Sequence, residues 1–285
     1  MQKIHIEKLN QTLSRIAFGG VIVSNETQPD ANNYVAEALD AGINYFDVAP
    51  TYANAEERLG PALKGKRNGV FLACKTEDRT RKGSQALLEK SLKHLQTDYF
   101  DLYQLHAVYT LADVEQTFGP NGAFETYVKA KEQGTIKHIG FSAHSTEAAL
   151  ALLDYYDFDS IMFPFNFVSL LKNDYGSFVL KKALEKKMGI IGIKSMAYGE
   201  KLPSDATDHP KAWYHPIEDF ELASKAVKYT FSRGVDVIVP PGDIHYLRWA
   251  IRIINQPNLN LTEEELDTLR PIAHQTVPLF PLKAK

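Results

Sequence analysis

Four residues in the N-terminal part of the chain have side chains that could together deliver a proton: Asp47, Tyr52, Lys75 and His106. A tyrosine hydroxyl has a pKa near ~10 in water, so it is a useful acid near neutral pH only where positive charge stabilises the phenolate. Lys75 could supply that charge, Asp47 could hold the ammonium in place, and His106 could donate a hydrogen bond to a substrate carbonyl oxygen. Tyr52 would then donate the proton, which is the chemistry needed when a carbonyl accepts a hydride.

Each of these residues also has a plain structural explanation when it is taken alone. Asp47 and Lys75 could form an ion pair inside the core, and His106 could be a hydrogen-bonded core histidine. Tyr52 could be a packing residue whose hydroxyl reaches water. The positions favour chemistry, because three of the four residues each end a short apolar segment typical of a buried strand, at 43–46, 70–74 and 103–105.

Short β-branched or aromatic segments alternate with longer amphipathic segments along the whole chain. Eight strands are predicted, at Arg15–Gly20, Ile43–Asp47, Val70–Thr76, Phe100–His106, Lys137–Ser142, Ser160–Phe165, Ile190–Ser195 and Val235–Pro240. Helices are predicted at Ala31–Ala41, Ala55–Leu63, Ser84–Leu95, Ala123–Gln133, Thr146–Leu153, Ser177–Lys187, Glu218–Ser232 and Asp243–Ile254. A further helix is expected to begin at Thr262, where Glu265 gives the spacing of a capping box.

Eight repeats of strand and helix predict a closed parallel (β/α)8 TIM barrel, because each helix crosses back over the sheet and closure removes both sheet edges. We expect a single domain over residues 1–285, since no linker or change in composition divides the chain. An open doubly wound sheet is the rival fold. That fold usually carries a Gly-x-Gly-x-x-Gly turn after its first strand, and Gly19-Gly20-Val21 lacks the third glycine.

In such a barrel the site is built where the carboxyl ends of the strands meet. We expect this end of the barrel to gather Asp47, Lys75, His106, Ser142, Lys194 and the turn at 240–242. The loops at 107–122 and 200–216, and the tail after His274, are expected to form the substrate region. Four aromatic residues would line an apolar pocket there, or anchor the loops on the barrel: Tyr109, Phe118, Trp213 and Tyr214.

Composition excludes several classes of protein. The net charge of −3 and the pI near 6.3 give no basic surface for nucleic acid or for an anionic membrane. The first residues lack the apolar core of a secretory signal and no apolar segment approaches transmembrane length, so a cytoplasmic location is expected by default. Cys74 is the only cysteine, so no intrachain disulfide, cysteine zinc site or iron–sulfur cluster is expected. No metal is expected, and a monomer is the default.

Three segments resemble the aldo-keto reductase superfamily. They are Gly42-Ile-Asn-Tyr-Phe-Asp-Val-Ala-Pro-Thr-Tyr-Ala-Asn-Ala-Glu-Glu-Arg-Leu-Gly60, Leu95-Gln-Thr-Asp-Tyr-Phe-Asp-Leu-Tyr-Gln-Leu-His106 and Gly134-Thr-Ile-Lys-His-Ile-Gly-Phe-Ser142. The resemblance implies the barrel fold and a catalytic tetrad of Asp47, Tyr52, Lys75 and His106. It also implies that a small carbonyl substrate accepts hydride from a reduced nicotinamide cofactor while Tyr52 donates the proton.

The same resemblance implies which residues bind the cofactor. Ser142 would hold the nicotinamide carboxamide, Gly20 would lie beside the pyrophosphate, and Arg248 would contact the adenosine 2′-phosphate of NADPH. Lys194, Ser195 and Gly242 complete the predicted cofactor-binding set. NADPH is therefore preferred, and NADH stays open.

Several positions depart from the family pattern. Ala143 and Met162 stand where an asparagine and a glutamine would complete the amide contacts, and Lys194 stands where an aromatic residue usually stacks on the nicotinamide. Gly242 replaces a lysine near the 2′-phosphate, while Ile251 and Arg252 replace the residues that usually hold adenine. We therefore expect the nicotinamide to be recognised by contacts that differ from those usual in the family. His144 is interpreted as a neighbour of the site.

Three other functions remain open from the residues. A lysine at a barrel strand end can form a Schiff base, so Lys75 or Lys194 could serve a lyase or aldolase. A non-catalytic NADP-binding regulatory barrel would bind cofactor without turnover. A metal hydrolase would need His106, His144 and Asp47 to converge, and the His-x-His that would indicate one does not follow the first strand.

Overall fold

A computed structural model of the chain describes residues 1–201 and 209–280. Eight strands run parallel in one sheet, in the spatial order β12-β9-β8-β7-β6-β5-β4-β3. Each coincides with one of the eight predicted strands, so those predictions are confirmed. The strands are β3 (Ala17–Gly19), β4 (Tyr45–Asp47), β5 (Phe71–Thr76), β6 (Phe100–Val108), β7 (Ile136–Ala143), β8 (Ser160–Phe163), β9 (Gly189–Ile193) and β12 (Val237–Val239).

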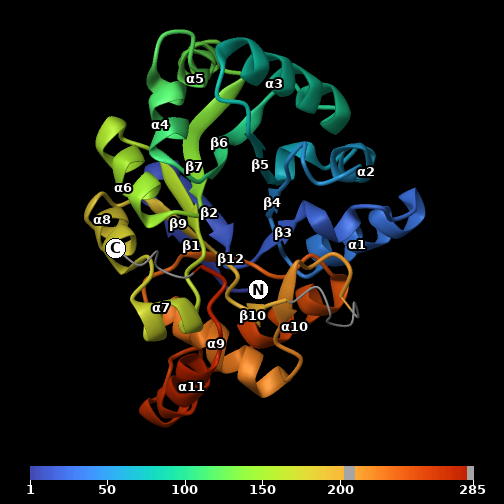
Figure 1. The fold of residues 1–285 in the computed structure, drawn as a ribbon. Coiled ribbons are helices and arrows are strands. Elements are labelled where there is room, and N and C mark those ends of the chain that lie inside the picture. The colour runs from blue at the N-terminus through green and yellow to red at the C-terminus, as the bar shows by residue number, and fades with distance from the viewer. Residues whose placement is uncertain (202–208, 281–285) are drawn as a thin grey trace.

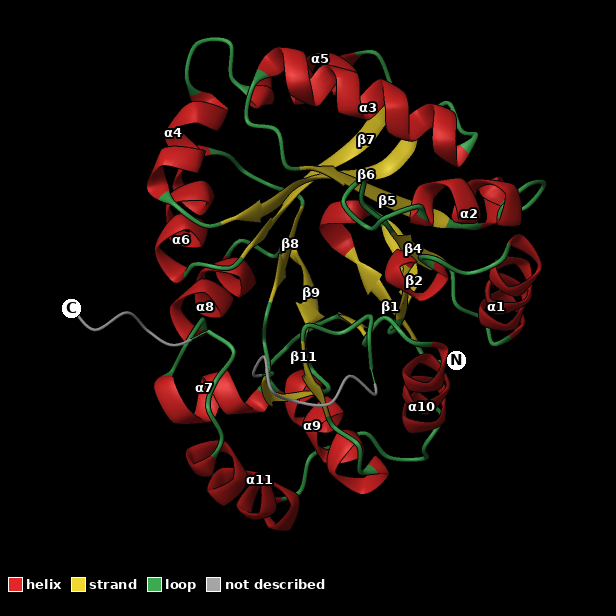
Figure 2. Ribbon diagram, turned by 45° about the vertical axis from the view of Figure 1, so that its right-hand side comes forward, coloured by secondary structure: helices red, strands yellow, loops and turns green. Residues whose placement is uncertain are grey.

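The two outer strands of this sheet meet and nearly close it. Ile16, next to β3, forms a parallel bridge with Ile238 of β12, and the Ile238 N–H donates to the Arg15 carbonyl oxygen at 3.0 Å. Helices surround the resulting barrel (Figure 1), and Figure 2 shows the strands at its centre with the helices outside. The predicted (β/α)8 barrel is confirmed, and the rival open sheet is wrong.

The predicted helices all form, with ends that differ by a few residues. Local capping explains several of their first residues: the Thr262 side chain accepts from the Glu265 N–H and Glu265 bonds back, which confirms the predicted capping box. The helices are α1 (Gln28–Asp40), α2 (Ala55–Ala62), α3 (Arg81–Leu95), α5 (Ala123–Glu132), α6 (Thr146–Tyr155), α8 (Ser177–Glu185), α9 (Phe220–Ser232), α10 (Ile244–Ile254) and α11 (Glu263–Gln275).

Several short elements were not expected from the sequence. They are the hairpin β1 (Lys3–Ile6) and β2 (Gln11–Ser14), the hairpin β10 (Ala197–Glu200) and β11 (Tyr214–Pro216), the helices α4 (Leu111–Phe118) and α7 (Phe167–Asn173), and the 3-10 turns η1 (Glu7–Leu9), η2 (Gly20–Val23) and η3 (Arg67–Gly69). The first hairpin places Ile6, Leu9 and Leu13 against the interior side chains of the barrel. It therefore closes the end opposite the expected site, because Gly189, at the start of β9, contacts Ile6 and Leu9.

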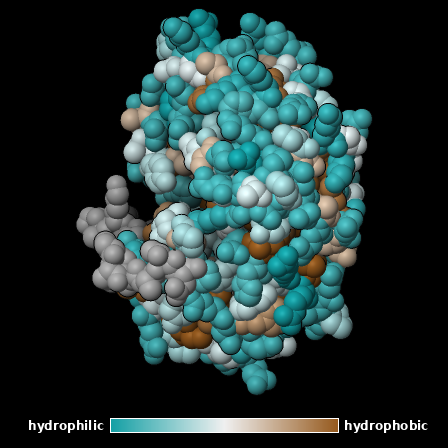
Figure 3. Space-filling view, turned by 90° about the vertical axis from the view of Figure 1, so that its right-hand side faces the viewer, coloured by the Kyte–Doolittle hydropathy of each residue, from teal (hydrophilic) through white to brown (hydrophobic). Residues whose placement is uncertain are grey.

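The expected substrate loops are only partly irregular. α4 occupies the middle of the loop at 107–122, and β11 lies at the end of the loop at 200–216, of which residues 202–208 lie outside the described part. Within the described ranges, none of the helices is both long and apolar enough to cross a membrane. The face in Figure 3 carries mostly hydrophilic residues, with hydrophobic ones in small separate patches.

Candidate active site

A pocket of about 580 Å³ opens at the carboxyl ends of the barrel strands. Its lining includes three members of the predicted tetrad, Asp47, Tyr52 and His106, and residues from all eight barrel strands or the turns directly after them. Lys75 lies directly behind this lining and is fully buried. The four residues are therefore brought together, as the sequence predicted.

Lys75 and Asp47 form a buried ion pair at the ends of neighbouring strands. The register of β4 and β5 places Asp47 opposite Ala73, and Lys75 lies two residues later on the same face. Lys75 Nζ lies 2.5 Å from Asp47 Oδ2 and also donates to the Val48 carbonyl oxygen at 3.3 Å. Burial would lower the pKa of Lys75, but its interactions with Asp47, Tyr52 and Cys74 together outweigh burial and raise that pKa. The ammonium is therefore held in its protonated form.

Tyr52 lies in the loop between β4 and α2, with its ring beside both Lys75 and His106. Lys75 Nζ is 5.5 Å from the ring centre, and the two rings of Tyr52 and His106 meet edge to face at 5.7 Å. Burial raises the pKa of Tyr52, while the charge of Lys75 and a hydrogen bond from it oppose that rise. The phenol is thus protonated at neutral pH, beside an ammonium that could stabilise the phenolate.

His106 is a neutral imidazole near neutral pH. Burial lowers its pKa well below the usual value, and the charges of Lys75 and Arg79 lower it further. Its Nδ1 lies 3.4 Å from Thr51 Oγ1, and its ring faces the pocket. A neutral histidine can donate one hydrogen bond to a carbonyl oxygen without itself giving up a proton.

Arg79 is a site residue that the sequence reasoning missed. Its buried guanidinium donates from Nη2 to the main-chain carbonyl oxygen of His106 at 2.6 Å and lies 3.9 Å from Asp113 of α4. Arg79 sits in a run of charged residues after β5, which in the sequence is typical of a solvated loop. That run carries no signal that could have identified its contact with His106.

Left-handed backbone occurs at four non-glycine residues of the pocket lining: Asn25, a residue type that tolerates it, and three others. Ala53, Ala107 and Lys194 have φ angles of 48°, 51° and 66°, in the left-handed region that residues other than glycine rarely adopt. Ala53 directly follows Tyr52, Ala107 directly follows His106, and Lys194 lies in the turn after β9. Such strain often lies where a fold holds side chains for binding or catalysis.

The residues expected to bind the cofactor divide into two groups. Ser142, Lys194 and Gly242 line the pocket, as does Met162, which pairs with Ser142 in the register of β7 and β8. Gly20, Ser195 and Arg248 lie outside the lining. Gly20 falls between the lining residues Gly19 and Val21, and a Cβ there would come within 2.8 Å of Val48 Cγ2.

Arg248 and Ser195 have contrasting surroundings. Arg248 is half exposed on α10, where it forms two hydrogen bonds of 2.7 and 2.8 Å with the carboxylate of Glu37 on α1. Ser195 is fully buried, and its hydroxyl has no hydrogen-bond partner within the described chain. Arg248, the residue predicted to contact the 2′-phosphate, is thus already paired with a carboxylate of the protein itself, that of Glu37.

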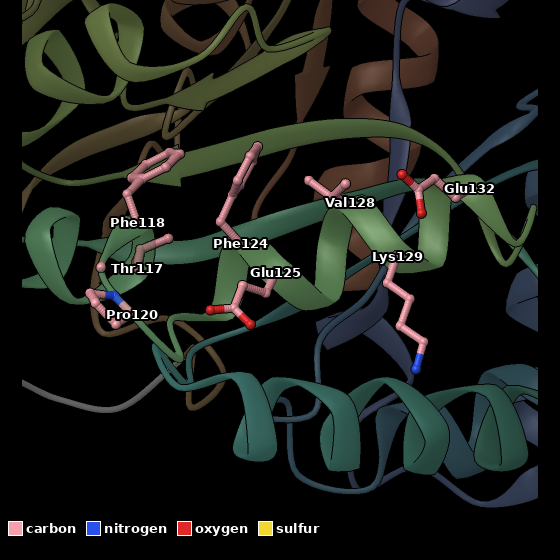
Figure 4. Close-up of a pocket in the computed structure, with 9 residues that line it drawn as sticks. Thr117, Phe118, Pro120, Phe124, Glu125, Val128, Lys129 and Glu132 are labelled. Carbon is pink, nitrogen blue, oxygen red and sulfur yellow. The ribbon is translucent and has the colours of Figure 1, made fainter.

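Of the four aromatic residues expected in the substrate region, three line the pocket and one does not. Tyr109, Trp213 and Tyr214 line the pocket. Phe118 does not line the pocket; it stacks on Tyr155 at 4.7 Å on the outside of the barrel, which fits the other alternative, that it anchors its loop there. There it borders a separate open groove that runs from the end of α4 along α5 and contains none of the tetrad (Figure 4). The end of α4 carries Phe118 away from the barrel mouth.

The residues suggested for a metal site do not form one. Within residues 1–201 and 209–280, three or more histidine, cysteine or acidic side chains nowhere converge in a way that could hold a metal ion. Asp47 instead pairs with Lys75. The rings of His144 and Phe280 stack at 5.2 Å.

The chain matches the model of the aldo/keto reductase family over residues 15–270. It is 25% identical to the uncharacterized oxidoreductase YqkF of Bacillus subtilis (strain 168), over 97% of this chain and 98% of that protein. It is 31% identical to the aldo-keto reductase YhdN of the same organism, over 68% of this chain and 60% of that protein. Among solved structures, aldo-keto reductase AKR11C1 from Bacillus halodurans (holo form) has the same fold, with a TM-score of 0.75 at 21% identity over 97% of this chain and 98% of that one.

Proposed function

Since this chain belongs to the aldo/keto reductase family, a family of oxidoreductases, we propose that it reduces aldehydes or ketones to alcohols by hydride transfer, with Tyr52 as proton donor. The observation that carries the proposal is the placement of Lys75. Its ammonium lies 2.5 Å from Asp47 and 5.5 Å from the centre of the Tyr52 ring. That arrangement holds a cation beside the pocket phenol whose ring also meets that of His106.

The four side chains have distinct roles in this mechanism. The Nε2 or Nδ1 hydrogen of neutral His106 binds the carbonyl oxygen and orients it toward Tyr52. Tyr52 passes its hydroxyl proton to that oxygen as negative charge develops there. Lys75 stabilises the resulting phenolate, and Asp47 keeps the Lys75 ammonium in place.

The hydride comes from reduced nicotinamide, with NADPH preferred and NADH open. Two features fit such a cofactor. The pocket lining includes both His106 and Gly242, and Asp47 Oδ1 in that lining and Ser195 Oγ beside it are buried without a hydrogen-bond partner among the described residues. The residues proposed to bind it are Gly20, Ser142, Ser195, Gly242 and Arg248, whereas Lys194, the remaining member of the predicted set, lies against Trp213 and Tyr214 in the expected substrate region. We further propose one barrel domain over residues 1–285. The cytoplasmic location and the monomeric state stay predictions.

The test is to mix the protein with NADPH and a panel of aromatic and aliphatic aldehydes and to follow the absorbance of the reduced cofactor. Tyr52→Phe should lower kcat by about 10²–10⁴-fold, because the general acid is removed, while NADPH still binds. Tyr155→Phe, which removes an exposed hydroxyl on α6, is the control. Full turnover by Tyr52→Phe would remove Tyr52 from the mechanism. Cofactor binding without turnover of any carbonyl would instead support the regulatory barrel.

The Schiff-base alternative has one observation in its favour. Burial lowers the pKa of Lys194 to about 8, so a fraction of this amine is free at neutral pH. Lys75 is a poorer candidate, since Asp47 keeps it protonated. Borohydride trapping with a carbonyl substrate separates the two functions: the reductase predicts no covalent adduct, and the lyase predicts an adduct that Lys194→Met abolishes.

A further inference from the structure

Lys194 lies in the wall of the active-site pocket with its ammonium among aromatic rings. Its Nζ is 4.3 Å from the ring centre of Tyr214 and 5.1 Å from that of Trp213. The same pocket contains Tyr52 and His106. A cation of the protein therefore shares one cavity with the groups that would receive a carbonyl.

The charge of Lys194 is not neutralised within the described part of the chain. No carboxylate there forms an ion pair with it, and burial is the sole cause of its lowered pKa. Lys211, in the same pocket, is the opposite case: its Nζ lies 2.5 Å from Glu26 and donates to the Ile22 carbonyl oxygen at 2.7 Å. A partly buried cation without an anion costs free energy, which a bound anion would recover.

His144 supplies a second unpartnered group on the same side of the pocket. Its ring lies between Tyr109 and Phe280, at 5.2 Å from each, and its Nδ1 has no hydrogen-bond partner among residues 1–201 and 209–280. Burial, and then the charge of Lys194, lower the pKa of His144 to about 3, so the ring is neutral and can donate one hydrogen bond. The ammonium and this neutral ring together form a site for an anion.

We propose that Lys194, assisted by His144, binds a carboxylate of the substrate, so that the substrates are aldehydes or ketones that also carry a carboxylate. The inference rests on the proposed reduction of carbonyl compounds. The substrate, rather than a cofactor phosphate, is the source of the anion because Lys194 lies against the rings of Trp213 and Tyr214 and shares the pocket with His144. These belong to the aromatic walls expected for substrate, whereas Gly242 and Arg248 lie toward α10.

The experiment compares acids with their own methyl esters, so that size and carbonyl reactivity are matched. The two pairs are 4-carboxybenzaldehyde and 4-oxobutanoate, each against its methyl ester, at saturating NADPH. For at least one pair, kcat/KM should be higher for the acid by about tenfold to a hundredfold, the range of one charge-assisted hydrogen bond in a partly buried site. Lys194→Met should reduce that ratio to about one, and Lys194→Arg should keep part of it.

Lys211→Met is the matched control, because it also removes a lysine from the pocket, but one that Glu26 already neutralises. It should leave the ratio of acid to ester unchanged. Esters reduced as well as acids by the wild-type protein would overturn the carboxylate site while leaving the proposed reductase intact. If Lys194→Met lowered kcat/KM equally for acid and ester, the lysine would be assigned to the cofactor, and the inference would also be overturned. Reduction of neither acid nor ester would count against the proposed function itself.

Discussion

Arg79 donates a 2.6 Å hydrogen bond from its guanidinium to the main-chain carbonyl oxygen of His106, although Arg79 lies in the loop after β5 and His106 lies in β6. The contact is made next to Ala107, whose φ of 51° interrupts the regular backbone near the end of β6. Arg79 thus fixes the backbone from which the His106 ring projects into the pocket. Burial lowers the pKa of that ring, and the charges of Lys75 and of this guanidinium lower it further.

The first prediction concerns Arg79→Met. Without the guanidinium, the His106 ring should shift, and kcat/KM for aldehyde reduction should fall by about tenfold to a hundredfold, because small displacements of a catalytic group are costly. The pKa of His106, measured by NMR titration, should rise, because one of the charges that depress it is gone. Arg79→Lys should restore part of both.

Arg81→Met is the control for that variant, because Arg81 forms only an exposed ion pair with Glu125. A loss of stability in Arg79→Met with no change in the titration of His106 would mean that Arg79 only supports the loop. That outcome would contradict its role in positioning His106.

The second prediction concerns the buried pair of Lys75 and Asp47. Lys75→Met leaves the Asp47 carboxylate buried without a cation, and the free energy of unfolding should fall by about 3–5 kcal/mol. The double variant Lys75→Met, Asp47→Asn should be more stable than Lys75→Met alone, since the orphaned charge is also removed. Urea denaturation measures both. If the losses of unfolding free energy in Lys75→Met and Asp47→Asn added up to the loss in the double variant, the two residues would not act as a pair.

The third prediction concerns Arg248, whose guanidinium is held by Glu37 at 2.7 and 2.8 Å. Glu37→Gln should weaken this contact and free Arg248 for the 2′-phosphate, raising the preference for NADPH over NADH by roughly threefold to tenfold. Arg248→Met should lower the same preference. Because both side chains are substantially exposed, neither variant should cost more than about 1 kcal/mol of stability. Fluorescence titration with NADPH and NADH gives the ratio of the two dissociation constants. Equal ratios in the wild type, Glu37→Gln and Arg248→Met would show that Arg248 does not contact the 2′-phosphate.

The barrel and the tetrad could be predicted because their signals are local. A buried strand such as Phe71–Thr76 is a continuous apolar segment, and a polar residue at its end is visible in the sequence. The hairpin of β1 and β2 could not be read in this way, since its strands are short and partly polar and its turn depends on Asn10 at a φ of 47°. α4 did carry a signal that was overlooked, because Thr110 and Asp113 form a capping box.

The contacts that decide the roles of individual residues could not be predicted from the sequence, because they join segments that are far apart in the chain. Arg248 and Glu37 are 211 positions apart, and their pairing depends on how α10 packs beside α1 at the closure of the barrel. Lys194 was visible as an unusual residue at a strand end. Its lack of a partner follows only from the paths of the surrounding loops, which the pattern of apolar residues does not specify.

The last prediction concerns stability at acidic pH. His144 has a pKa of about 3 in the folded chain, lowered by burial and by the charge of Lys194, against about 6.5 when unfolded. Below pH 6.5 the unfolded chain therefore binds more protons, so acid favours unfolding, by up to ~1.4 kcal/mol per pH unit for this residue. His144→Phe keeps the stacking on Phe280 and should flatten the dependence of the unfolding free energy on pH between 6 and 4.5. His245→Phe, on the exposed face of α10, is the control; an unchanged slope in His144→Phe would mean that His144 is protonated in the folded protein.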